Sequence, residues 1–202
     1  FASRGLVLSF FGKSSHASQP ENGHNPARAI SKLIIDIPEL TAREDHRGIV
    51  MATVVCVRIG EEAFGTNAGF GQLMLTIRAE FESELDALDA EICARARAYA
   101  RQDGITNVEI QYRDSFPETR NTPDAVAAVR KARLECGLPE ARWDEPFRSS
   151  EDFGCYTKLT SGALFYIGCG TRHAKLHTRE YDFNDEIIEP AVDMMFRLAQ
   201  DA

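Results

Sequence analysis

Residues 5–113 alternate between strand-like and helix-like patterns in an order that few folds can accommodate. Apolar or alternating runs predict four strands, at residues 5–11, 48–59, 73–81 and 108–112. Apolar residues at helical spacing predict one helix before the second strand and another before the fourth. With right-handed crossovers, the order β-α-β-β-α-β predicts an α+β fold of the ferredoxin-like kind, a four-stranded antiparallel sheet with both helices on one face.

Each of the two predicted helices begins with its own local signal. Asn25 and Pro26 are typical of an N-cap followed by the first helical residue. Ser83 with Asp86 three positions later predicts a capped start for the second helix. Gly104 follows the second apolar stripe and predicts its end.

The remaining two fifths of the chain have a different make-up. Two prolines in residues 116–123 interrupt the pattern and place a domain boundary between residues 116 and 117. Beyond it we expect three helices and one buried strand, the wholly apolar run 163–167. So little sheet indicates that residues 117–202 are the end of an α/β layer whose other strands lie outside this chain. A first residue Phe1 in place of Met also indicates a piece of a longer protein.

Composition excludes some classes of partner. The net charge of −8 argues against a nucleic-acid or anionic-membrane partner, and no apolar run is long enough to span a membrane. The five cysteines are widely spaced and odd in number, so we expect reduced thiols in a cytoplasmic protein. A catalytic cysteine is disfavoured because none lies in a strand-turn-helix context beside a base.

Two polar segments, each punctuated by glycine or proline, carry histidines. His16 lies in the loop between the first strand and the first helix, and His177 follows the apolar run 163–167. An imidazole on a loop between rigid elements is a common place for binding or chemistry. From the residues alone, a surface histidine beside a turn is an open alternative to a functional role for His16, and a loop histidine bonded to a carbonyl is the alternative for His177.

The segments GKSSHASQPENGHNPARAI, SSEDFG, GALFYIGCG and LHTREYDFNDEIIEPAV, in this order, resemble the aminoacylase/carboxypeptidase-type metallopeptidase family, which includes N-acyl amino acid amidohydrolases and hippurate hydrolase. The resemblance implies a lid domain over residues 1–116 that forms a homodimer. It implies that residues 117–202 are the C-terminal part of the catalytic domain. The catalytic domain's first half, with most metal ligands and the general base, is absent, so this chain alone is expected to be inactive.

The resemblance assigns a role to each histidine. His177 matches the family's last metal-binding position, with Zn or Mn as the metal, and imidazole is a good ligand for either. His16 matches the lid histidine that reaches the partner subunit's active site and stabilises the tetrahedral oxyanion. His173, four residues before His177, is expected to be exposed because its segment is not convincingly helical.

Four further residues match substrate-binding positions. Arg78 would grip a substrate carboxylate bidentately, although an ordinary charge on an exposed sheet face is the alternative. Asn67 lies near the family's polar substrate contact. Gly168 and Gly170 would let backbone N–H groups approach the carboxylate, and simple turn glycines are the alternative.

Together these features predict that the intact protein is a metal-dependent amidohydrolase. Its substrate would be an N-acyl amino acid or a peptide, cut at an amide bond next to a carboxylate, with one or two metal ions. The competing hypothesis is a non-catalytic ferredoxin-like module for dimerisation or small-molecule binding. Metal ligands supplied from outside this chain would decide between the two.

Overall fold

The computed structural model describes residues 1–141, 143–171 and 173–200. Its contacts divide the chain into two compact units. Unit 1 comprises residues 1–118 and the short segment 147–151, and unit 2 comprises the described parts of residues 119–146 and 152–202. Each unit is described by itself.

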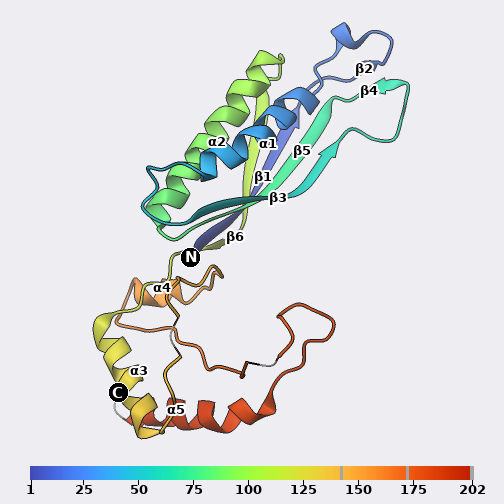
Figure 1. Cartoon of the computed structure of the whole chain (residues 1–202). Helices are drawn as coiled ribbons and strands as arrows, with labels where there is room; N and C mark the ends of the chain where they lie inside the picture. Colours follow the sequence, from blue (N-terminus) through green and yellow to red (C-terminus); the bar gives the residue numbers. More distant parts are fainter. Residues whose placement is uncertain (142, 172, 201–202) are drawn as a thin grey trace. The chain divides into compact units, whose positions relative to one another are not determined.

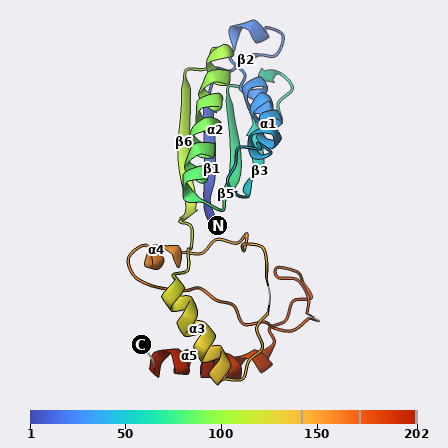
Figure 2. The ribbon, with the colours of Figure 1, turned by 60° about the vertical axis from the view of Figure 1, so that its left-hand side comes forward.

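Unit 1 is built on a four-stranded antiparallel sheet with the strand order β3-β5-β1-β6. The strands are β1 (Ala2–Phe11), β3 (Val50–Ile59), β5 (Phe70–Ala79) and β6 (Asn107–Phe116). Two helices, α1 (Ala27–Thr41) and α2 (Glu82–Gln102), connect them and lie on the same face of the sheet (Figure 1, Figure 2). The element order and strand pairing confirm the predicted ferredoxin-like topology.

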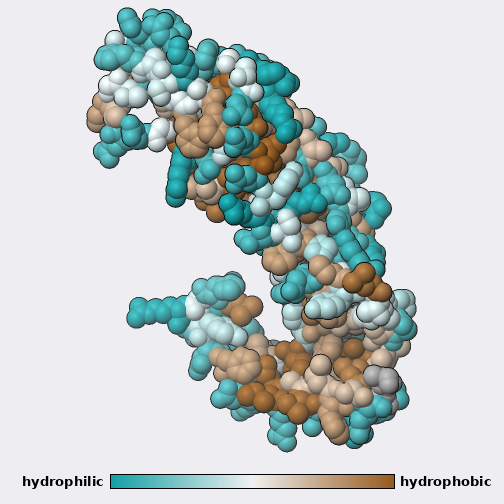
Figure 3. Space-filling model, turned by 180° about the vertical axis from the view of Figure 1, so that it is seen from behind, coloured by the Kyte–Doolittle hydropathy of each residue, from teal (hydrophilic) through white to brown (hydrophobic). Residues whose placement is uncertain are grey.

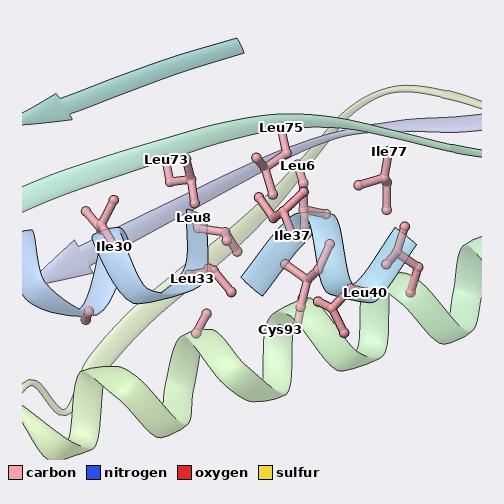
Figure 4. Packing of buried hydrophobic residues seen from close by; sticks show 14 of the residues in the cluster. Leu6, Leu8, Ile30, Leu33, Ile37, Leu40, Leu73, Leu75, Ile77 and Cys93 are labelled. Atoms are coloured by element: carbon pink, nitrogen blue, oxygen red, sulfur yellow. The ribbon is translucent and has the colours of Figure 1, made fainter. Parts of the chain in front are cut away.

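The core of unit 1 lies between the sheet and its two helices. In the ladder between β1 and β5, Leu6 pairs with Leu75 and Leu8 with Leu73, so the two central strands present leucines to the helices. Figure 4 shows these side chains facing the apolar stripe of α1. That stripe and its counterpart on α2 are buried: Ile30, Leu33, Ile37, Leu40, Leu85, Leu88 and Ile92. Burying each such side chain contributes about 1.5–3 kcal/mol.

The two helices of unit 1 differ in how they start. The helix α1 begins at Ala27 with Pro26 at its N-cap position, one residue later than predicted, and Asn25 Oδ1 accepts a hydrogen bond from the Ala27 N–H at 2.9 Å. The predicted Ser83 cap is wrong, since α2 already begins at Glu82. There the Glu118 carboxylate accepts the Glu82 N–H at 2.7 Å, so a residue 36 positions away takes the place of a local cap.

A buried carboxylate ties α2 to two strands. Asp89 is 6% exposed and accepts hydrogen bonds from Arg4 Nη1 of β1 at 2.8 Å and from Tyr112 Oη of β6 at 3.4 Å. The Cys93 thiol, one turn further along α2, bonds to the same carboxylate at 3.2 Å. Burial first, and the hydrogen bond to Asp89 second, raise the pKa of Cys93 to about 12, so the thiol stays protonated.

Unit 2 contains α3 (Pro123–Glu135), α4 (Gly154–Thr157) and α5 (Ile188–Gln200), with no strand among its described residues. The predicted buried strand at residues 163–167 is therefore wrong. A strand needs a neighbouring strand for its N–H and C=O groups, whereas here the Asn121 side chain pairs with the Leu164 backbone, through two hydrogen bonds of 2.9 Å. Apolar character alone predicted a strand that has no ladder partner in the described chain.

Among the described residues, no helix is both long and apolar enough to cross a membrane.

Candidate functional site

Two of the candidate site residues meet on a small two-stranded ribbon. β2 (Ser15–His16) pairs antiparallel with β4 (Thr66–Asn67), so that Ser15 lies opposite Asn67 and His16 opposite Thr66. The ribbon extends from one end of the sheet of unit 1 (Figure 1). We call residues 12–25 and 60–69, which form this ribbon and its connections, the arm. The register of the ribbon brings together residues that are 50 and 52 positions apart in the sequence.

Backbone hydrogen bonds brace the arm along its length. The Gly12 N–H donates to Gly69 O at 2.7 Å, and the Ala17 N–H donates to Gly65 O at 2.9 Å. Lys13 and His24 exchange a pair of bonds of 2.8 and 3.1 Å. The segment that carries His16 is thus part of a bonded structure and not a free loop.

The His16 ring is exposed and bonded on one side only. Its Nδ1 accepts the Ser18 N–H at 3.1 Å and lies 2.7 Å from Ser18 Oγ. A backbone N–H can only donate, so Nδ1 holds the lone pair and the neutral ring carries its proton on Nε2. No described residue bonds to Nε2. The arm therefore presents an unoccupied N–H donor.

Asn67 uses its side-chain amide within the arm. Its Nδ2 donates to Ser15 Oγ at 3.0 Å, and its Oδ1 accepts from Asn25 Nδ2 at 2.8 Å. These bonds join the ribbon to the start of α1. A substrate contact from Asn67 stays a prediction, and in this structure its amide positions the segment around His16.

Arg78 lies on the sheet face opposite the helices, near the far end of β5. Its Nη1 donates to Ser150 Oγ at 2.8 Å and to Arg148 O at 3.3 Å. Residues 147–151 form neither helix nor strand and belong to unit 1. Eight residues of strand separate Arg78 from Phe70, where the arm rejoins the sheet, which is roughly 26 Å. Arg78 and His16 are therefore not brought together within one copy of the chain.

The candidate residues of unit 2 lie in irregular chain. His177 is exposed, in a turn, with the unusual φ of +64° for a residue other than glycine. Gly170 has a φ of +98°, which favours glycine, whereas Gly168 has no such requirement and open space where a side chain would be. The side chain of Asn184 donates to Cys169 O at 3.2 Å and fixes this glycine segment to the start of α5.

The sequence matches a model of a known protein family. The model described as peptidase family M20/M25/M40 matches residues 14–201, nearly the whole chain. The chain belongs to this family. The resemblance to aminoacylase-type metallopeptidases is thereby confirmed.

The M20/M25/M40 relatives are about twice as long as this chain. N-acetyldiaminopimelate deacetylase from Bacillus licheniformis is 26% identical over 198 residues, which are 94% of this chain and 50% of the deacetylase. Hippurate hydrolase from Campylobacter jejuni is 23% identical over 195 residues, 95% of this chain and 50% of the hydrolase. The chain thus spans about half the length of these relatives.

Solved structures show the same fold. The aminobenzoyl-glutamate utilization protein from Klebsiella pneumoniae superimposes with a TM-score of 0.75 at 19% identity, over 99% of this chain and 48% of that protein. Aminopeptidase PepT from Bacillus cereus gives a TM-score of 0.74 at 14% identity, over 98% of this chain and 51% of PepT. At these identities the likeness establishes the fold alone.

The M20 family is metal-dependent in general, so we tested whether residues of this chain could hold a metal ion. The described residues contain no group of three or more His, Cys, Asp or Glu side chains placed to do so. His177 belongs to no such group among these residues, and the Nδ1 of nearby His173 lies 2.9 Å from Ala174 O. The described part of the chain therefore does not form a metal site of its own.

An apolar cavity of about 490 Å³ lies within unit 2, between α3, α5 and residues 163–168. Figure 3 shows hydrophobic side chains gathered on unit 2. The cavity is bordered by Val126, Val129, Phe165, Ile187 and Met194, and Gly168 lies at its edge. Apolar surface of this kind is what a covering layer of secondary structure would bury.

Proposed function

We propose that the intact protein is a metal-dependent amidohydrolase that cleaves an N-acyl or peptide-like amide bond next to a carboxylate. Membership of the M20 family supports hydrolysis, and the names of the deacetylase and hippurate hydrolase relatives support an N-acyl amino acid as substrate. The observation that carries the proposal is the His16 Nε2–H, held outward on a braced arm. Such a preorganised donor stabilises a developing oxyanion.

In this proposal His16 donates to the oxyanion of the tetrahedral intermediate, and Arg78 binds the substrate carboxylate through its guanidinium. Asn67 holds the arm and is the third residue assigned to the substrate. An amino-acid-sized substrate is much shorter than the roughly 26 Å between Arg78 and the base of the arm. His16 and Arg78 must then come from two copies of the chain if they act on one substrate molecule.

The second copy is proposed to pair along β3. This edge strand has ten residues and no neighbour on its outer side in the described chain. Its Val55 is 62% exposed, and Val54 and Val57 are also exposed. Long apolar edge strands are rarely left open in native proteins, because they template pairing with another chain. An isologous dimer would join two sheets across β3 and bury these valines.

Residues 1–116 are accordingly proposed as the lid and dimerisation domain, and residues 117–202 as the C-terminal part of the catalytic domain. His177 would provide one ligand to Zn or Mn, and Gly168 and Gly170 would border the substrate. Since the described residues form no metal site, the remaining ligands would come from the rest of the intact protein. The 202-residue chain alone is then inactive.

Two variants of the full-length protein test this proposal, with N-acetyl amino acids as substrates and elemental analysis for metal. His177→Ala should lose tightly bound metal together with activity, since it removes a ligand. His16→Ala should keep its metal and lose about 10²–10³-fold in kcat, the effect of losing one oxyanion donor. The control His173→Ala, also exposed and in the same segment, should change neither.

Unchanged turnover in His16→Ala would exclude the oxyanion role. Full metal content in His177→Ala would exclude the ligand role. A full-length protein that neither binds metal nor cleaves any N-acyl amino acid would instead favour the non-catalytic dimerisation module.

A further inference from the structure

Among the described residues, Ser18 is the one that bonds to Nδ1 of the His16 ring. Its backbone N–H donates to Nδ1 at 3.1 Å, and its hydroxyl oxygen lies 2.7 Å from the same nitrogen. Because the N–H can only donate, Nδ1 is an acceptor, and the hydroxyl hydrogen completes the contact by donating as well. Both polar groups of Ser18 therefore converge on a single ring nitrogen.

The backbone places Ser18 there. The Gln19 N–H donates to His16 O at 2.9 Å and closes a tight turn over residues 16–19. The bond from Ala17 N–H to Gly65 O at 2.9 Å fixes this turn against the residue before β4. Pro20 then starts the short helix of residues 20–22 and restricts the chain that follows. The position of Ser18 relative to the ring is thus set by backbone bonds on both sides.

We propose that Ser18 is a positioning residue that holds His16 in the tautomer with its proton on Nε2. The proposal rests on the function proposed above, for which the ring must offer a donor and not a lone pair at Nε2. In the other tautomer, Nε2 would be an acceptor and could not bond to an oxyanion. Ser18 itself does not touch the reacting atoms and acts through the ring.

The chain contains an internal contrast. The Nδ1 of His173 lies 2.9 Å from Ala174 O, and a carbonyl oxygen can only accept. His173 should therefore carry its proton on Nδ1 when neutral, the opposite of His16. Two exposed histidines of one protein are expected to show opposite tautomers, each determined by a single neighbouring residue.

The test is the ring ¹⁵N spectrum of the 202-residue chain at a pH where imidazole is neutral, with His16 assigned by loss of its signals in His16→Gln. His16 should show a protonated Nε2 and a bare Nδ1, and His173 the reverse. Ser18→Ala should shift the Nδ1 signal of His16 and leave the other four histidines in place. Ser18→Thr, which keeps a hydroxyl, should restore it, and the loop control Ser14→Ala should leave it unchanged.

A His16 ring protonated on Nδ1 would overturn the assignment, and so would the tautomer mixture of an unstructured histidine peptide. An Nδ1 signal that does not move in Ser18→Ala would show that the Ser18 hydroxyl does not hold the ring. The amide spectrum of each variant establishes that the arm is still folded, so an unchanged ring cannot be attributed to lost structure.

Kinetics of the full-length enzyme separate this proposal from the proposed function. Ser18→Ala should lower kcat about threefold to tenfold with KM unchanged, the size of one hydrogen bond, and Ser18→Thr should restore it. If the spectra show the expected tautomer but neither Ser18→Ala nor His16→Ala alters kcat, Ser18 still holds the ring, and the catalytic role of His16 fails.

Discussion

Units 1 and 2 differ in how far their apolar residues are buried. Unit 1 has a continuous buried cluster between sheet and helices, whereas unit 2 buries only Ala132 and Met194 among its described hydrophobic residues. Met195 and Phe196, on the well-patterned helix α5, are 59% and 60% exposed. The difference shows that amphipathic helices without a sheet to cover do not make a core.

The same difference extends to the candidate site residues. In unit 1, His16 and Asn67 are held by a braced arm, and each has defined partners. In unit 2, His177 and Gly168 lie in irregular segments where no described group of side chains forms a site. This contrast agrees with the proposed function, in which His16 is a preformed hydrogen-bond donor and His177 would need further ligands from the rest of the intact protein.

The largest expected effect is in the core of unit 1. Leu75→Ala on central strand β5, where Leu75 is 1% exposed, should lower the free energy of unfolding by about 2–5 kcal/mol. Leu159→Ala in unit 2, where the side chain is 87% exposed, should change it by less than about 0.5 kcal/mol. Urea unfolding followed by circular dichroism measures both. Equal losses would contradict the comparison.

A smaller effect is expected at the buried carboxylate. Asp89→Ala removes the partner of Arg4 and Tyr112 and should cost about 1–3 kcal/mol, less than a fully buried pair because Arg4 is partly exposed. Asp193→Ala on exposed α5 is the matched control in unit 2, with a change within about 0.5 kcal/mol. If Asp89→Ala leaves the free energy of unfolding unchanged in the same urea experiment, this network does not hold α2 to the sheet.

The smallest effect concerns the Cys93 thiol, whose pKa is raised to about 12 from an ordinary value of 9.0. The native state holds this proton more tightly than the unfolded state. The contribution of the thiol to the free energy of unfolding is therefore complete below pH 9 and is lost as the pH rises towards 12. Cys93→Ala should therefore flatten the alkaline loss of stability. Cys155→Ala, at an exposed cysteine of unit 2, should leave it unaltered. If the stability of wild type and Cys93→Ala falls in parallel as the pH rises, the thiol does not contribute to the alkaline loss of stability.

Much of unit 1 could be predicted from the sequence because its signals are local. Periodicity located all four strands of the sheet and both helices, Asn25 lies two residues before the start of α1, and Gly104 marked the end of α2 as expected. The error at Ser83 arose because the real cap, Glu118, is distant in sequence. Local patterns carry no information about such a partner.

The site was less predictable, since its contacts are tertiary. The bond between Arg78 and Ser150 spans 72 positions, and the pairing of Ser15 with Asn67 depends on strand register. The contact of Ser18 with His16 is local, so the spacing of two residues was a signal that could have been used. The apolar run 163–167 failed as a strand because its pattern describes burial and not the presence of a neighbour.

Amide hydrogen exchange of the 202-residue chain, read by mass spectrometry, tests the contrast between the two units most directly. Peptides from β1, β5 and α2 should be strongly protected, and peptides from residues 163–171 and 173–183 should exchange close to the rate of an unstructured chain. Comparable protection in both units would contradict the account, because unit 2 would then hold a stable structure without any covering layer.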